Sequence, residues 1–252
     1  MRMLHLQMMY RCHEDCCQVN MTLLSTFSRF ILYILGWSLP PTEEIERSLR
    51  NLNRAVVVYP HTSMWDFFFA LLYQGAYSPL LQANNFRPRF LVAHTFFRNP
   101  VSRWFLGSIG AISAPDRGTT GNGTISVIVE QILIRDERTL FFISPKGTRA
   151  LCPHRSGYYY IAKGLKAPII KMALDYSRHT LVISSVTEDP TRNDYGEVEA
   201  NVHWWFSWLP QLRLNREPFE HINVTTSIIS YSSPLWLILS FGVSFLVAYC
   251  VG

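Results

Sequence analysis

The chain has 252 residues, which is enough for one sizeable α/β domain with a well-buried core. Apolar residues make up 48% of it and charged residues only 16%, a composition that indicates contact with a membrane. The net charge is +5, and arginine makes up 19 of the 23 basic residues, which favours binding to anionic lipid and phosphate groups. No basic cluster indicates nucleic-acid binding. The five cysteines are irregularly spaced, which argues against a disulfide scaffold.

The N-terminal part of the chain divides into three segments. Residues 1–22 are polar, and we expect them to be poorly ordered; their cysteines lack a standard zinc spacing, and we predict no metal site. Residues 23–39 are apolar but short and interrupted by Arg29, which favours a helix at the membrane interface or a re-entrant segment over a full span. Residues 42–54 are typical of a charged amphipathic helix with Thr42 as its N-cap. We therefore assign residues 23–54 to membrane-interfacial and amphipathic helices.

The central part of the chain alternates between apolar strands and helical segments. The alternation predicts a mostly parallel sheet covered by helices on both faces. The expected strands are residues 55–59, 90–94, 109–113, 139–144, 168–174 and 180–185. The expected helices are residues 64–77, 99–107, 123–136 and 156–165. The predicted domain extends over residues 55–230.

The C-terminal part is aromatic and then apolar. The cluster of Trp204, Trp205 and Trp208 fits either an aromatic belt at the membrane interface or an aromatic core around a helix. Leu235 to Gly252 is an 18-residue run without charge, which meets the minimum for a transmembrane helix. We predict a membrane anchor at residues 231–252, with a buried core helix as the alternative.

A histidine and an aspartate lie five residues apart just after the first predicted strand. Pro60 ends that strand, and Ser63-x-x-Asp66 is typical of a helix start, so His61 lies in a strand-to-helix turn. Open α/β sheets carry their chemistry at such strand ends. A histidine beside a carboxylate can act as a general base near neutral pH. Residues five apart on one helix point about 140° away from each other, so the two can meet only if His61 precedes the helix. The alternative is that Asp66 only caps the helix through Ser63 and His61 is an ordinary loop histidine.

Four sequence blocks together resemble a known family. The His61-x4-Asp66 block is similar to the signature of the glycerolipid acyltransferases, the lysophosphatidic acid and glycerol-3-phosphate acyltransferase superfamily. Residues 110–117 are similar to its second motif, which ends in an arginine. Residues 142–149 are similar to its Pro-Glu-Gly-Thr-Arg block, and residues 167–170 to its late apolar-proline motif. The four blocks occur in the family's order.

The resemblance implies a membrane-bound O-acyltransferase similar to 1-acyl-glycerol-3-phosphate acyltransferases. Such an enzyme moves a fatty acyl group from an acyl thioester, either acyl-CoA or acyl carrier protein, to the hydroxyl of a lysophospholipid or glycerophosphate. His61 would be the general base and Asp66 would orient it. No cofactor is implied beyond the co-substrate, the expected partner surface is a phospholipid membrane, and we expect the catalytic domain to face the cytosol. The substrate-binding candidates are Arg117, Lys146, Gly147, Thr148 and Arg149.

The third block departs from the family pattern at one position. Lys146 stands where the family has a glutamate, which reverses the sign of the charge there. Either the acceptor is more anionic than usual, or the block is partly degraded. The second reading leads to an alternative function, a catalytically altered, membrane-anchored protein that only binds lipid. An acyltransferase with a non-glycerolipid acceptor is the remaining alternative.

Overall fold

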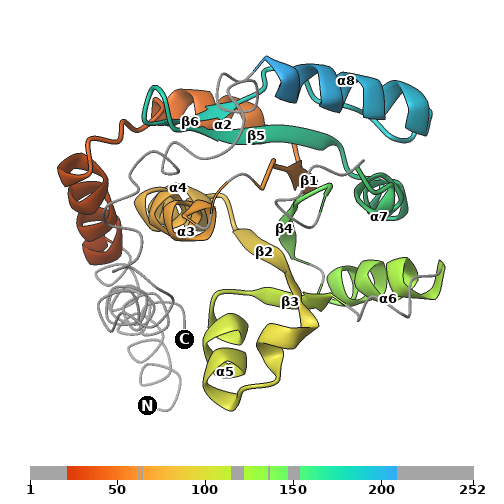
Figure 1. The fold of residues 1–252 in the computed structure, drawn as a ribbon, viewed down its shortest axis with the longest axis horizontal. Coiled ribbons are helices and arrows are strands. Elements are labelled where there is room, and N and C mark those ends of the chain that lie inside the picture. Colours follow the sequence, from red (N-terminus) through yellow and green to blue (C-terminus); the bar gives the residue numbers. More distant parts are fainter. Residues whose placement is uncertain are drawn as a thin grey trace, which may run out of the picture.

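The computed structural model describes residues 22–208, apart from residues 62, 64, 115–121, 136 and 147–153. Its centre is a six-stranded sheet in the order β3-β2-β4-β1-β5-β6 (Figure 1). The strands are β1 (Arg54–Val58), β2 (Phe86–Ala93), β3 (Ala111–Ala114), β4 (Arg138–Ile143), β5 (Ile169–Asp175) and β6 (Thr180–Ile183). All neighbouring pairs are parallel except β5 and β6, which are joined by a short turn and run antiparallel. The predicted mostly parallel sheet is therefore confirmed.

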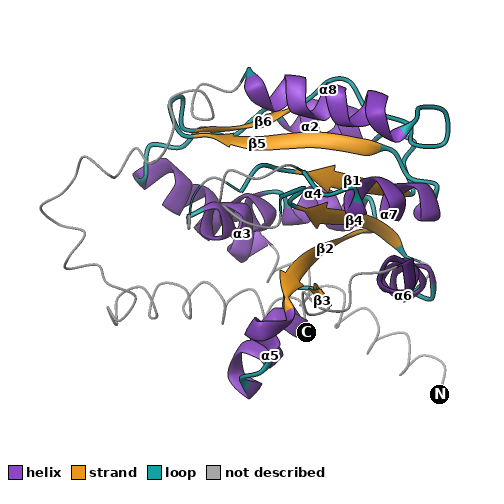
Figure 2. Cartoon of the chain, turned by 45° about the vertical axis from the view of Figure 1, so that its right-hand side comes forward, coloured by secondary structure: helices purple, strands orange, loops and turns teal. Residues whose placement is uncertain are grey.

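Helices cover both faces of the sheet, as predicted. The α-helices are α2 (Thr42–Leu49), α3 (Asp66–Ala76), α4 (Ser78–Ala83), α5 (Pro100–Ser108), α6 (Asn122–Leu133), α7 (Gly157–Leu165) and α8 (Tyr195–Ser207), and a short 3-10 helix, η1, spans His94–Phe97. One core contains buried apolar side chains from α6, α7 and α8, and a second contains side chains from α2, α3 and α4. Figure 1 shows α6 and α7 on one side of the strands and α3 and α4 on the other. In Figure 2 the sheet runs from β6 at the top to β3 at the bottom, with α5 below it.

Three local predictions differ from the structure. Helix α2 begins with Thr42 as its first helical residue, so Pro41 holds the N-cap position and no side chain caps the helix. Helix α4, with Pro79 in its first turn, was not predicted, because Ser-Pro after a long helix is typical of a break. Strand β2 begins at Phe86 although Pro88 lies within it. The proline is tolerated because β3 pairs with β2 only from Phe90 onward, so Pro88 has a strand on one side alone.

The aromatic cluster in α8 is divided between core and surface. Phe206 is buried in the core that also contains side chains of α6 and α7, whereas Trp204 and Trp208 are exposed and their rings pack on each other. The aromatic-core interpretation is therefore confirmed for Phe206. The membrane-interface interpretation stays a prediction.

The helix of residues 22–34 lies against α3. Its Leu24 and Leu32 are buried, and Ser25 Oγ donates a hydrogen bond of 2.8 Å to the carbonyl of Ala76. The two helices approach so closely at Gly75 that a Cβ there would lie 2.2 Å from the Oγ of a serine in the facing helix. The opposite face of the N-terminal helix exposes large apolar side chains: Leu23, Phe30, Tyr33 and Ile34.

No helix in the described part of the chain has both the length and the apolar character required to span a bilayer. The anchor predicted at residues 231–252, and residues 1–21 of the segment expected to be poorly ordered, lie outside the described residues.

Candidate active site

The site begins where β1 ends. The Tyr59 amide donates to the carbonyl of Ile143, which extends the pairing of β1 with β4 by one residue. After Pro60 the chain leaves the sheet, and α3 begins at Asp66. His61 thus precedes the helix, and its Nδ1 lies 3.0 Å from Asp66 Oδ2. The structure brings together the two residues that the sequence predicts as a pair.

Asp66 is buried, and His61, Ser63 and Tyr176 contact its carboxylate. Oδ2 receives the backbone N–H of Ser63 at 2.8 Å in addition to His61, and Oδ1 receives the Tyr176 hydroxyl at 2.7 Å. The Ser63 bond is the helix-start interaction of the alternative interpretation, and Asp66 makes it together with the His61 contact. A buried carboxylate requires such donors, because removal from water is otherwise strongly unfavourable.

Tyr176 is the site residue that sequence reasoning missed. It lies 110 residues from Asp66 in the chain, in the turn after β5. The turn is held by Asp175, whose Oδ1 accepts hydrogen bonds from the amides of Ser177 and Arg178. Burial, and then the charge of Asp66, raise the pKa of the Tyr176 hydroxyl, so it remains protonated and donates to Asp66. No local sequence signal connects Tyr176 to Asp66, because the contact depends on β5 lying beside β1.

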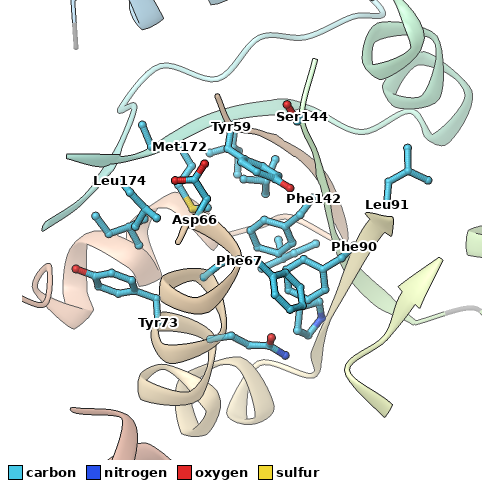
Figure 3. Close-up of a pocket in the computed structure, with 18 of the residues that line it drawn as sticks. Tyr59, Asp66, Phe67, Tyr73, Phe90, Leu91, Phe142, Ser144, Met172 and Leu174 are labelled. Carbon is cyan, nitrogen blue, oxygen red and sulfur yellow. The ribbon is translucent and has the colours of Figure 1, made fainter. Parts of the chain in front are cut away.

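A cavity of about 420 Å³ adjoins the pair and is lined mostly by apolar side chains. Figure 3 shows Phe67, Phe90 and Phe142 gathered beside Asp66, with Met172 and Leu174 nearby. The rings of Phe90 and Phe142 stack with their centroids 5.0 Å apart. Tyr59 also lines the cavity, and burial followed by the charge of Asp66 raises its pKa to about 12. An apolar cavity with a few polar groups at one place is the usual form of a small-molecule site.

Among the predicted substrate-binding residues, only Lys146 is described. It follows the last residue of β4 by three positions, as His61 follows the last residue of β1, and these ends lie side by side in the sheet. Lys146 therefore lies at the same edge of the sheet as His61, the edge formed by the carboxyl ends of the parallel strands. The other four candidates, Arg117, Gly147, Thr148 and Arg149, lie outside the described residues.

Ionisable side chains that sequence reasoning missed, His154 and Glu199, interact electrostatically in the neighbourhood of Lys146. Burial lowers the pKa of His154, and the positive charge of Lys146 lowers it further, while Glu199 opposes both. Glu199 Oε1 lies 2.8 Å from His154 Nδ1, a close contact without hydrogen-bond geometry, and Glu199 Oε2 accepts a hydrogen bond from the Tyr158 hydroxyl.

Among the described residues no group of three or more histidine, cysteine or acidic side chains is arranged to hold a metal ion.

The sequence and the fold are similar to those of known proteins. Residues 42–175 match the family model described as Acyltransferase, and this match begins with α2, ends with β5 and includes His61 and Asp66. Among solved structures, the 1-acyl-sn-glycerophosphate (LPA) acyltransferase PlsC from Thermotoga maritima is similar, with a TM-score of 0.54 and 15% sequence identity over 81% of this chain and 84% of that chain. At this identity the likeness is one of fold. No curated protein matches the sequence. The family model covers more than half of the chain, and the chain therefore belongs to the acyltransferase family.

Proposed function

We propose that the protein is a membrane-bound acyltransferase that moves a fatty acyl group from an acyl thioester to the hydroxyl of a lysophospholipid or glycerophosphate. The observation that carries the proposal is the His61–Asp66 pair at the wall of an apolar cavity. The pair supplies a base for the acceptor hydroxyl, and the cavity offers space for a hydrocarbon chain.

The contacts of Asp66 support Nε2 of His61 as the nitrogen that acts as the base. A carboxylate only accepts hydrogen bonds, so Nδ1 of His61 carries the proton that points at Asp66 and Nε2 is left to act as the base. Nε2 takes the proton of the acceptor hydroxyl as its oxygen attacks the thioester carbon. Asp66 stabilises the imidazolium that forms. When the tetrahedral intermediate collapses, the carbon–sulfur bond breaks and the imidazolium returns its proton to the leaving thiolate. The acceptor hydroxyl is itself the nucleophile, so no covalent enzyme intermediate is required.

The cavity is the proposed site of the acyl chain. Its volume lies within the range of roughly 300–1,000 Å³ that small-molecule sites occupy. Phe90, Phe142 and Met172 offer apolar contacts along its wall. With the acyl chain of the donor between these side chains, its thioester would lie beside His61. The donor is acyl-CoA or acyl carrier protein, and the reaction needs no other cofactor.

The acceptor's head group is proposed to bind at the sheet edge beside His61. The position of Lys146 at that edge supports this placement. Arginines bind phosphate through two parallel hydrogen bonds, and backbone amides at a turn add further donors. We propose that the acceptor phosphate is held by Arg117, Lys146, Gly147, Thr148 and Arg149.

Membrane attachment is the remaining part of the proposal. The apolar outer face of the 22–34 helix and the net charge of +5 support it. We place the catalytic domain on the cytosolic side.

The test is acyl transfer by the full-length protein in membranes, with lysophosphatidic acid, lysophosphatidylcholine and glycerol-3-phosphate as parallel acceptors. Removal of a general base typically lowers the rate by about 10²- to 10⁴-fold, so His61→Ala is expected to lose transfer to that extent. His94→Ala is the matched control, since His94 pairs with the hydroxyl of Ser113 instead of a carboxylate. Full activity of His61→Ala would refute the mechanism.

A second candidate function follows from Lys146. If the reversed charge has abolished turnover, the protein binds lysophospholipid without transferring an acyl group, and His61→Ala leaves that binding unchanged. Transfer to none of the three acceptors, together with tight binding of one, would favour this candidate. Transfer to a non-glycerolipid acceptor in a wider panel would instead show that Lys146 has changed the acceptor class.

A further inference from the structure

Helix α5 and the preceding η1 present an apolar surface to solvent. On α5, Leu106 points inward to a small core with Leu24 and Leu71. Val101 and Trp104 lie three residues apart, which places them on one face of the helix, and they are 53% and 59% exposed. Phe96 in η1 is 61% exposed. Isolated exposed apolar residues need no explanation, but three large ones on adjoining elements indicate an interaction site.

Residues 94–108, which form these two elements, carry only positive charge. Arg98 and Arg103 are both exposed, and residues 94–108 contain no aspartate or glutamate. The Nε of Arg103 donates a hydrogen bond of 3.0 Å to the carbonyl of Phe97, which ties α5 to η1. We call Phe96, Val101 and Trp104 together with these two arginines the η1–α5 patch.

The patch adjoins the cavity of the candidate active site. Phe96 and Ala93 are among the residues that line the cavity, which also reaches His61 and Asp66. Phe96 therefore has one side toward the cavity and another toward solvent. A lipid chain that left a bilayer at this patch would reach the cavity across apolar side chains.

We propose that the η1–α5 patch docks on the surface of an anionic phospholipid bilayer. The proposal deepens, and rests on, the proposed function of a membrane-bound acyltransferase. Tryptophan is enriched at the membrane–water interface, and each basic residue near an anionic surface contributes about 1 kcal/mol of attraction. A second copy of the chain is a poorer occupant. A two-fold contact would bring Arg98 and Arg103 of both copies to one place, and like charges across an interface are unfavourable.

Helix α8 offers a natural comparison surface. Trp204 is 60% exposed, much like Trp104, but α8 carries Glu197 and Glu199 and no lysine or arginine. The two tryptophans therefore match in residue type and exposure and differ in the charge around them. Trp104 is expected to dock on an anionic bilayer, and Trp204 is not.

The experiment places the full-length protein in vesicles of phosphatidylcholine and phosphatidylserine, with either ordinary or brominated acyl chains. Bromine quenches tryptophans that enter the acyl region, so the difference in emission between the two vesicle types measures their number among the chain's seven. Trp104→Phe is expected to reduce this difference, and Trp204→Phe is expected to leave it unchanged. Arg98→Glu should reduce it toward the Trp104→Phe level, whereas Arg192→Glu, at an exposed arginine before α8, should not.

Several outcomes would overturn the proposal. One is no loss of quenching in Trp104→Phe, and another is an equal loss in both tryptophan variants. Absence of quenching together with a dimer that Trp104→Ser dissociates would instead identify the patch as an interface between copies. His61→Ala separates this proposal from the catalytic one, because the variant should be quenched like the unchanged protein even though its acyl transfer should be about 10²- to 10⁴-fold slower.

Discussion

Replacing Tyr176 with phenylalanine removes one hydroxyl from the support of Asp66 and leaves the ring in place. The ring packs against Trp37 and Phe69, with centroid distances of 5.2 and 6.0 Å, and phenylalanine can keep these contacts. The lost interaction is the 2.7 Å hydrogen bond to Asp66 Oδ1. Asp66 then retains the His61 contact and the Ser63 amide, both on the other carboxylate oxygen.

The size of the effect follows from the charge of the acceptor. A hydrogen bond to a charged group contributes about 1.5–3 kcal/mol. If Tyr176 supports Asp66 mainly while His61 is protonated in the transition state, the loss appears in kcat as a decrease of between about 10-fold and about 150-fold. KM is expected to remain unchanged, because Tyr176 lies behind Asp66 and is not among the residues that line the cavity. A decrease in kcat without a change in KM is the signature of an interaction realised in the transition state.

The assay compares kcat and KM for acyl transfer with the free energy of unfolding. Tyr159→Phe is the matched control, because the Tyr159 hydroxyl donates to the carbonyl of Asn193 far from Asp66. Both variants are expected to be less stable than the unchanged protein, but only Tyr176→Phe should lose kcat. Unchanged kcat in Tyr176→Phe, or equal losses in both variants, would refute the assignment of Tyr176 as a positioning residue.

Two further predictions concern stability, and thermal denaturation measures the first. Gly75→Ala is expected to lower the free energy of unfolding by about 1–3 kcal/mol, because the new Cβ would lie 2.2 Å from a serine Oγ of the 22–34 helix. Gly107→Ala is the control and should lack this loss, because no atom lies within 4 Å of a Cβ there. Lys171→Met leaves the buried carboxylate of Glu188 without its cation and should destabilise the protein by about 3–5 kcal/mol. In urea denaturation, the double variant Lys171→Met with Glu188→Leu should recover part of the lost free energy of unfolding. No recovery would contradict the explanation that the unpaired buried carboxylate causes the loss.

The His61–Asp66 pair could be predicted from the sequence because everything that creates it is local. A β-branched strand, a proline and a helix-start pattern lie within a dozen residues, and together they place the histidine outside the helix. The strands themselves were predictable as apolar runs between helical segments. Their order, with β4 and β5 on either side of β1, was not, because it is determined by packing between segments more than 80 residues apart.

Contacts across the sheet explain what could not be predicted at the site. Tyr176 reaches Asp66 only because β5 pairs with β1, and neither residue has a local pattern that indicates the other. The neighbourhood of Lys146 likewise depends on α8, which brings Glu199 beside His154. Sequence patterns thus identify residues whose partners are near in the chain, and they miss the buried hydroxyls and charges that the fold adds.

Helix α3 connects the site to the N-terminal helix. Asp66 is its first residue, and Ala76, its last, accepts hydrogen bonds from Ser25 and Arg29. The ten steps between them correspond to about 15 Å along a helix axis, so α3 acts as a rigid spacer of fixed length and fixed rotation. One inserted residue within α3 would turn its two ends by about 100° relative to each other, and either the Asp66 contacts or the clamp at Ala76 would be lost. The length of α3 is therefore as much a condition for the His61–Asp66 pair as the identity of the two residues.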